Sequence, residues 1–121
     1  MIVGSVTNLE ARIEVTLYLP GLPDRLIEFV VDTGFEGALA LPPATVASLG
    51  LPYTSRLWAN LADDSDVPVD GFEAEIRWDD QERVVTVLAM GRRPLLGTAL
   101  IEGFNLSADF EEDGQLALTP L

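Results

Sequence analysis

Asp32-Thr33-Gly34 is the tripeptide of this sequence whose residue types are best suited to catalysis. The largely apolar residues 27–31 precede it and predict a strand that carries the aspartate to its end, where the carboxylate is held rather than freely solvated. A carboxylate fixed in this way can serve as a general base or, when protonated, as a general acid. Asp, Thr and Gly are also common turn residues, so the tripeptide alone favours an ordinary turn.

Residue types that are absent restrict the chemistry further. The chain of 121 residues has no Cys and no His, and its seven basic residues are all Arg. This excludes Ser-His-Asp triads, Cys nucleophiles, Lys Schiff bases and Cys/His zinc sites. Any catalysis by this chain alone therefore depends on carboxylates, with Tyr18 and Tyr53 as further candidates.

The charge of the chain limits its partners. With a formal net charge of −13, the surface repels nucleic acid and anionic membranes, and it suits solubility or neutral and basic peptide partners. No segment approaches the roughly 20 apolar residues that cross a bilayer, and residues 1–6 lack the basic region of a signal peptide. We therefore expect no nucleic-acid or membrane partner and a cytoplasmic location.

Two other segments are candidates for the surroundings of Asp32. Leu95-Leu96-Gly97 lies about 60 residues downstream and ends a second apolar strand. Between the two motifs, residues 57–61 and 67–69 are both β-prone, and the residues that join them are rich in Asp and Ser. This pattern predicts a hairpin over residues 57–69.

Alternation of apolar and polar residues dominates the rest of the chain and predicts a β-rich single domain over residues 1–121. Strands are expected at residues 13–19, 72–78, 85–89, 106–110 and 115–118, separated by turn residues at 20–24, 79–80 and 111–114. Two short helices interrupt this pattern. One is expected after Pro42 and Pro43 and ends at Gly50, and the other runs from Thr98, as its cap, to Gly103. Each is expected to follow an apolar strand that ends in a glycine turn, which suggests a weak internal duplication.

With these motifs in this order, the sequence resembles the retropepsin-like aspartic proteases, in particular their small bacterial single-domain members. The resemblance covers most of the chain, from about residue 2 to residue 120. It rests on residues 30–37, Leu41-Pro42, the segment Leu61-Ala62-Asp63-Asp64-Ser65 and residues 94–98.

The resemblance implies an all-β fold with two short helices, a closed β-barrel of the acid-protease type. Each chain would supply one Asp32, and the catalytic pair would form across a two-fold axis in a homodimer, with terminal residues 1–6 and 116–121 at the interface. Two carboxylates about 3 Å apart cannot both ionise, so the pair shares a proton and activates a water to hydrolyse a peptide bond. No cofactor or metal is expected, and the expected partners are a peptide or protein substrate and a second copy of the chain.

The resemblance also implies roles for the other matched residues. Thr33 would hydrogen-bond across the dimer, and Gly34 would let the substrate backbone approach. Leu95, Leu96 and Gly97 would support the active-site loop. Substrate would contact Phe35, Glu36 and a flap formed by the hairpin, whose matched residues are Leu61, Ala62, Asp63, Asp64 and Ser65.

The sequence departs from the family pattern at two places. Glu36 replaces a residue that is small and neutral in many relatives, and it could select basic side chains or disturb the catalytic pair. Asp64 stands where relatives commonly have Gly, which would stiffen or reshape the flap turn. Asp63, Asp64, Asp66 and Asp70 do not have the spacing of a calcium-binding loop, so a solvated acidic turn is predicted there.

Two alternatives remain open at this point. A catalytically silent dimeric peptide-binding module could use the same fold, and a structural β-barrel unrelated to proteases could carry the motifs by coincidence. An intact Asp-Thr-Gly favours the enzyme, because a binding module has little use for two abutting carboxylates.

Overall fold

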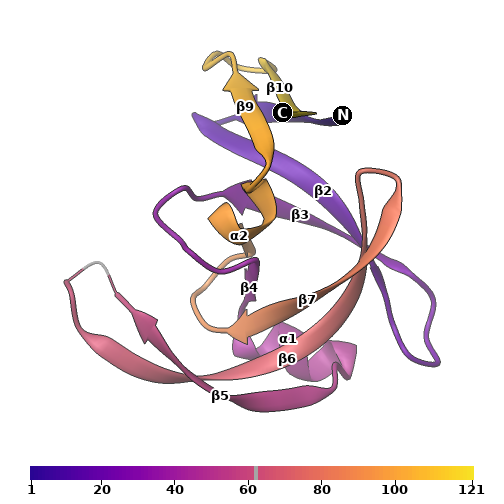
Figure 1. Ribbon diagram of the computed structural model, residues 1–121, viewed down its shortest axis with the longest axis vertical. Helices are drawn as coiled ribbons and strands as arrows, with labels where there is room; N and C mark the ends of the chain where they lie inside the picture. Colours follow the sequence, from indigo (N-terminus) through magenta and orange to yellow (C-terminus); the bar gives the residue numbers. More distant parts are fainter. Residues whose placement is uncertain (62) are drawn as a thin grey trace.

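The computed structural model describes residues 1–61 and 63–121 and consists mainly of β-strands (Figure 1). Among these residues the chain forms β1 (Ile2–Thr7), β2 (Glu10–Tyr18), β3 (Arg25–Val31), β4 (Leu39–Leu41), α1 (Pro43–Leu49), β5 (Tyr53–Asn60), β6 (Asp66–Trp78), β7 (Gln81–Ala89), β8 (Leu95–Leu96), α2 (Thr98–Ile101), β9 (Phe104–Ala108) and β10 (Gln115–Pro120). The prediction of an all-β chain with two short helices is confirmed.

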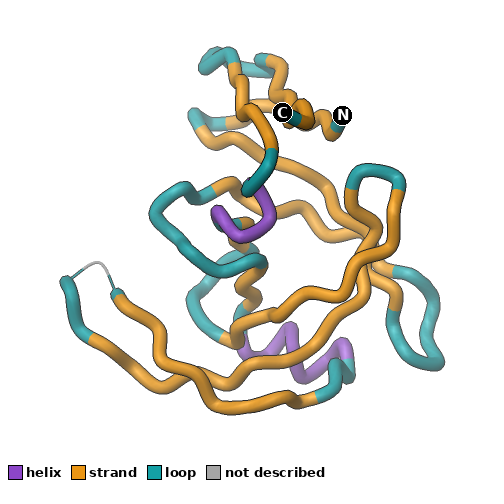
Figure 2. Tube along the Cα trace, viewed as in Figure 1, coloured by secondary structure: helices purple, strands orange, loops and turns teal. Residues whose placement is uncertain are grey.

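The strands form one sheet that curls into a partial ring. Their order is β5-β6-β7-β4-β8-β3-β2-β1-β10-β9, and a further pairing joins β2 to β6 at Leu17↔Ile76. Two pairs in this ring are parallel, β3 with β8 and β4 with β7. Figure 2 shows the β5–β6 hairpin extending away from the ring, on the side opposite the loop that joins β2 to β3.

The alternating apolar residues fill the inside of the ring. On β2 the buried side chains include Ile13, Val15 and Leu17, and on β6 they include Ala74 and Ile76. Burying each large aliphatic side chain stabilises the fold by about 1.5–3 kcal/mol. The core therefore fixes the register of β2 and β6, since a shift by one residue would expose these side chains.

The first helix matches its prediction and the second differs. Helix α1 begins at Pro43 and ends at Leu49, and Gly50 caps it with a left-handed φ of 65° that suits glycine. Helix α2 ends earlier than predicted, at Ile101, and Thr98 does not cap it. The Thr98 hydroxyl instead donates to the carbonyl oxygen of Phe35, at 3.3 Å, because the α2 segment is tied to the loop that follows β3.

Two other predictions need correction. Strand β4 separates the Asp32 loop from α1, so the suggested duplication of strand, glycine turn and helix is incomplete. Strand β9 ends at Ala108 rather than Phe110, which is 62% exposed. A tight turn replaces the end of the predicted strand, in which the Glu111 N–H donates to the carbonyl oxygen of Asp109 at 2.9 Å.

The terminal strands pair with each other inside the chain, and Figure 1 shows both chain ends side by side. Strand β1 lies between β2 and β10, and β10 lies between β1 and β9, so the outer strands of the sheet are β5 and β9. Removal of residues 119–121 would break the pairs Thr119↔Asn105 and Pro120↔Phe104. Such a truncation would therefore loosen the protomer itself, whatever it did to a dimer. Within the described residues, no helix is long and apolar enough to span a membrane.

Candidate active site

Asp32 follows directly on the last residue of β3, and a neighbouring strand holds its backbone. Strands β3 and β8 are parallel, with Val30 opposite Leu95 and Val31 opposite Leu96. The N–H of Asp32 donates to the carbonyl oxygen of Leu96, at 2.9 Å. The two motifs about 60 residues apart in sequence are thus adjacent in the structure.

The Asp32 carboxylate is oriented by its own loop. Its Oδ1 accepts a hydrogen bond from the Gly34 N–H at 2.9 Å. The backbone carbonyl oxygen of Asp32 accepts a second one from the Phe35 N–H at 3.1 Å. Asp32 is partly exposed and Thr33 and Gly34 are exposed. The carboxylate is therefore held in one orientation while remaining accessible to water or to a second molecule.

The rest of the loop is fastened to residues 97–99. The Gly97 N–H donates to the carbonyl oxygen of Ala38 at 2.9 Å, and the Thr98 N–H donates to that of Phe35 at 2.8 Å. A Cβ on Gly97 would overlap the carbonyl oxygens of Phe35 and Gly37. Only glycine permits this close approach, so Gly97 lies where support of the Asp32 loop was expected. Leu96 is fully buried and Leu95 is partly exposed.

Strands β5 and β6 form the predicted hairpin, with Leu57 opposite Val69 and Asn60 opposite Asp66. At its tip the Leu61 N–H donates to the carbonyl oxygen of Ser65 at 2.8 Å. Asp63 accepts hydrogen bonds from the hydroxyl and the backbone N–H of Ser65, and these bonds lower the pKa of the Asp63 carboxyl. The predicted contact residue Ala62 lies outside the described residues.

Asp64 has a left-handed backbone, with φ of 65°. This conformation costs most L-residues roughly 1–2 kcal/mol. For Asp64 the cost is smaller, because a short polar side chain can hydrogen-bond locally. The turn therefore keeps a conformation that glycine favours, although glycine is absent. The Asn60 side-chain amide donates to Asp64 at 3.2 Å and to Asp66 at 3.1 Å, which orders the acidic tip.

The Asp32 loop and the hairpin tip face each other across a pocket of about 450 Å³, here called the Asp32 pocket. It is lined by Asp32, Gly34, Phe35, Asn60, Leu61, Asp64, Met90 and Leu95. The structure thus brings six of the predicted site residues to one cavity, from segments that are far apart in sequence. Thr33, Asp63 and Ser65 do not line it, and Leu96 and Gly97 lie behind the loop.

A second pocket of about 500 Å³ continues along the hairpin, here called the Glu36 pocket. Its lining comprises Gly34, Phe35, Glu36, Gly37, Leu57, Trp58, Ala59, Asn60, Leu88 and Met90. Sequence reasoning did not place Trp58, Asn60, Leu88 or Met90 among the site residues. A reason to consider Trp58 was present in the sequence, since this large apolar residue stands at a position of β5 whose neighbours on the same face are polar. Nothing in the sequence indicates that Met90, which follows β7, lines a pocket.

Neither pocket has the residues of a metal site. Among residues 1–61 and 63–121, no group of three or more carboxylates could hold a metal ion. A partly exposed carboxylate such as that of Asp32 can act on water or on a polar ligand.

No protein-family model matches this sequence, and no curated protein matches it significantly.

Proposed function

We propose that the chain is a homodimeric aspartic endopeptidase of the retropepsin-like type. One observation carries the proposal. A partly exposed aspartate, oriented by the Gly34 N–H at 2.9 Å, directly follows β3, an inner strand of the sheet, and faces a β-hairpin across the Asp32 pocket. Such a pocket could receive an extended peptide between the loop and the hairpin, with the carboxylate next to a backbone carbonyl.

The proposal requires a second copy of the chain. Hydrolysis of an amide needs one group that takes a proton from water and another that gives a proton to the carbonyl oxygen. In the described part of the chain, the Asp32 pocket contains only Asp64 as a further titratable group, and Asp64 belongs to the hairpin tip rather than to a rigid strand. Pairing of Asp32 with the same residue of a second copy supplies the missing carboxyl group.

The chemistry follows from the pairing. The ionised carboxylate takes a proton from a bound water, whose oxygen attacks the carbonyl carbon of the peptide bond. The protonated carboxyl group gives its proton to the carbonyl oxygen, which forms a tetrahedral diol. The first carboxyl group then gives the proton it took from water to the leaving nitrogen, and the C–N bond breaks. A hydroxyl of the diol returns its proton to the other carboxylate, which leaves a carboxylic acid product and restores the shared-proton state.

The neighbouring residues have supporting roles in this proposal. Thr33, which is exposed, hydrogen-bonds across the two-fold axis in this proposal, and the backbone bonds of residues 97–99 fix the loop. The hairpin covers the bound peptide and excludes water. The partial ring of strands, with the Asp32 loop facing the β5–β6 hairpin, supports the family resemblance.

The test compares cleavage by the wild type and Asp32→Asn. A mixture of peptides or a denatured protein serves as substrate, from pH 3.5 to 7.5, over protein concentrations that span dimer formation. Asn keeps an oxygen that can accept the Gly34 N–H, so the variant should fold normally, as circular dichroism would show. We expect cleavage that rises faster than linearly with protein concentration, is strongest in acid and is absent in Asp32→Asn.

Two results would oppose the proposal. Equal cleavage by both proteins would point to a contaminating protease. A stable wild-type dimer that cleaves nothing across the whole range would favour the catalytically silent peptide-binding module.

A further inference from the structure

The Glu36 pocket combines apolar walls with one carboxylate. Leu57 and Ala59 of β5, Leu88 of β7 and Met90 supply the walls. Among the described residues that line the pocket, Glu36 is the only charged one. A pocket of this kind suits a side chain with a long aliphatic stem and a charged end.

Glu36 is not used by the fold. It is exposed, and none of the ion pairs in the described part of the chain includes it. Arg56, which belongs to the same hairpin as Trp58, is already paired with Asp70 at 3.4 Å. The Glu36 carboxylate is therefore available to a cation from outside the chain.

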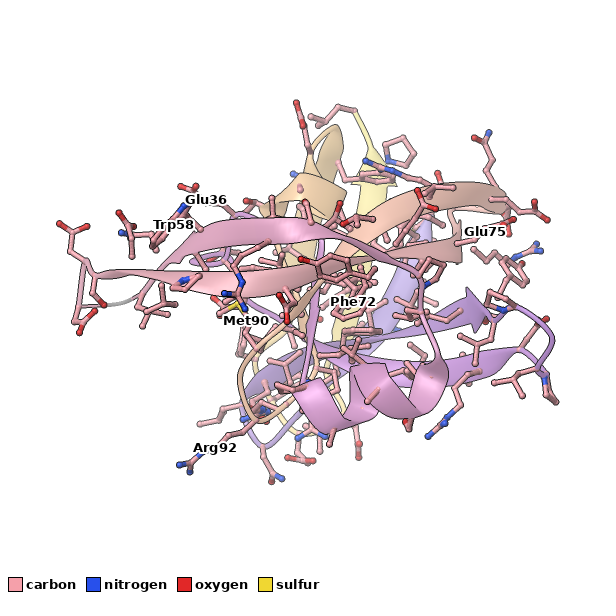
Figure 3. All side chains as sticks on the ribbon, turned by 90° about the horizontal axis from the view of Figure 1, so that it is seen from below. Glu36, Trp58, Phe72, Glu75, Met90 and Arg92 are labelled. Atoms are coloured by element: carbon pink, nitrogen blue, oxygen red, sulfur yellow. The ribbon has the colours of Figure 1, made fainter. Side chains whose placement is uncertain are left out.

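Trp58 adds a second group that favours a cation. It is 74% exposed and lines the same pocket as Glu36, and Figure 3 shows both residues at the same end of the molecule. An exposed tryptophan beside a pocket is a frequent binding residue, and its ring attracts cationic groups. The fold gains little from leaving this side chain in water.

We infer that the Glu36 pocket is a specificity subsite that takes an arginine or lysine side chain of the peptide substrate. The inference rests on the proposed protease function and names its substrate class. The ammonium or guanidinium group pairs with Glu36, and the aliphatic stem lies between Leu57, Leu88 and Met90. The net charge of −13 favours the approach of such basic peptides. In a two-fold dimer the pocket occurs twice, so the preference falls at two substrate positions, one on each side of the cleaved bond.

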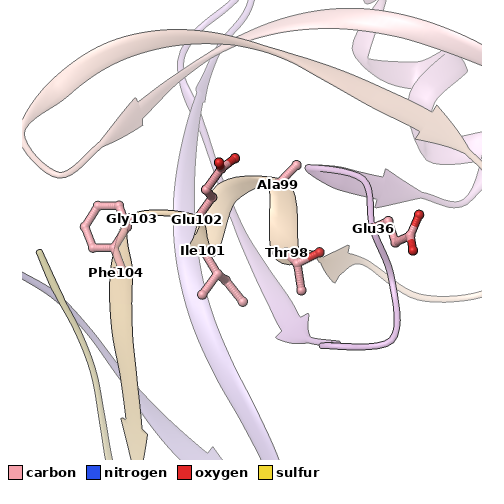
Figure 4. A pocket seen from close by; sticks show the side chains of 7 residues that line it. All are labelled: Glu36, Thr98, Ala99, Ile101, Glu102, Gly103 and Phe104. Carbon is pink, nitrogen blue, oxygen red and sulfur yellow. The ribbon is translucent and has the colours of Figure 1, made fainter. Parts of the chain in front are cut away.

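A neighbouring hollow also includes Glu36 and is the main alternative site at which a cationic side chain could meet this carboxylate. It holds about 590 Å³ and is lined by Glu36, Glu102, Phe104 and residues of α2. In Figure 4 the Glu36 carboxylate points to the side away from Thr98 and Ala99 of α2. Asp32 does not line this hollow. The Glu36 pocket, in contrast, shares Gly34, Phe35, Asn60 and Met90 with the Asp32 pocket.

The experiment measures kcat/KM for peptide sets in which one position at a time is Arg, its neutral isostere citrulline, or Glu. We expect the wild type to prefer Arg over citrulline by about tenfold at the two positions. Glu36→Gln should reduce this ratio to about one, and Glu36→Arg should favour Glu instead. Trp58→Leu should weaken the Arg preference without reversing it. Glu102→Gln removes the same charge from the competing hollow alone and serves as the matched control.

A second readout separates this inference from the proposed function. Binding of the same peptides to Asp32→Asn, measured by fluorescence anisotropy, reports on the pocket without cleavage. If the wild type cleaves no peptide, the protease proposal fails, while tighter binding of Arg peptides that is lost in Asp32→Asn/Glu36→Gln still supports the subsite. Cleavage with equal rates for Arg and citrulline would overturn the subsite and leave the protease proposal intact. Loss of the preference in Glu102→Gln but not in Glu36→Gln would also overturn it.

Discussion

The backbone N–H of Asp32 donates to the carbonyl oxygen of Leu96 at 2.9 Å. The loop that carries the aspartate therefore depends on the pairing of β3 with β8, a strand that lies more than 60 residues further along the sequence. The pair is parallel, and only two residues of β8 take part in it. Such a short pairing offers little stability of its own. The position of Asp32 therefore also depends on the hydrogen bonds and close contacts of the residues that follow β8.

Gly97→Ala tests this dependence. A Cβ at this position would overlap the carbonyl oxygens of Phe35 and Gly37, and backbone atoms in a hydrogen-bonded loop cannot move aside easily. We expect the free energy of unfolding to fall by about 1–3 kcal/mol, as for other overpacked sites, together with loss of cleavage. Urea denaturation followed by circular dichroism measures the first effect.

Gly34→Ala is the comparison variant. Its Cβ would meet only the side-chain Oδ1 of Asp32, at 3.2 Å, in an exposed part of the loop. We expect the unfolding free energy to change by less than about 1 kcal/mol, although cleavage should fall because Gly34 lines both pockets. A Gly97→Ala protein as stable as the wild type would contradict the tight fit described here.

Leu95 and Leu96 should respond differently to truncation, because successive side chains of a strand point to opposite faces. Leu96 is fully buried, whereas Leu95 is partly exposed and lines the Asp32 pocket. Leu96→Ala should lower the unfolding free energy by about 2–5 kcal/mol, and Leu95→Ala by less, with its main effect on KM. Equal destabilisation by the two variants in urea melts would show that β8 does not lie between core and pocket as described.

The periodic parts of the fold could be predicted from the sequence. Alternation along β2 and β6 indicated which side chains are buried, since one face of each strand meets the core and the other meets water. The proline pair and Gly50 placed α1 for a local reason, the backbone geometry of helix ends. The hairpin of β5 and β6 also followed from β-prone arms around an Asp-rich turn.

Long-range pairing could not be predicted in this way. Nothing local indicates that Val31 lies beside Leu96, or that the Thr98 hydroxyl bonds to Phe35 instead of capping its helix. The family resemblance led us to expect Asp32, Phe35 and Leu61 near one another, and all three line the Asp32 pocket. Met90 lines the same pocket only because of the path of the chain after β7. The pairing of β1 with β10 likewise depends on the whole sheet.

The interaction of Glu75 with Glu82 makes a contribution to the stability of the fold that depends on pH. A hydrogen bond with Glu82 raises the pKa of the Glu75 carboxyl, with partial desolvation and the negative charge of Glu82 acting in the same direction. The folded chain therefore holds this proton more tightly than the unfolded chain. The contribution is complete below the ordinary pKa of glutamate and is lost as pH rises through the raised value.

Glu82→Gln should remove this dependence. The amide can donate to the ionised Glu75, so the melting temperature at pH 7 should rise slightly, by roughly 1–3 °C, and the difference should shrink in acid. Glu73→Gln removes one charge from β6, the strand of Glu75, and leaves both Glu75 and Glu82 in place, so it is the control. The same rise in both variants would show that general charge reduction, rather than the Glu75–Glu82 pair, is responsible.

Association of two copies should depend strongly on salt and pH. Each chain carries −13, so a dimer forms against mutual repulsion, which salt screens over a Debye length of about 10 Å at 0.1 M. Acid should also strengthen association by neutralising carboxylates. Glu10 and Asp63 should contribute least to this effect, because a hydrogen bond from Arg93 lowers the pKa of Glu10 and bonds from Ser65 lower that of Asp63.

Sedimentation equilibrium at pH 5 and pH 8, in about 20 mM and about 500 mM sodium chloride, measures this dependence. We expect the dimer dissociation constant to fall by about tenfold or more from low to high salt at pH 8, and by less at pH 5, where less charge remains to be screened. Sodium chloride is preferable to sulfate, because sulfate also strengthens apolar burial. An affinity that is the same in all four conditions would show that charge does not control association, and the acid preference expected for cleavage would then have to arise at the Asp32 pair alone.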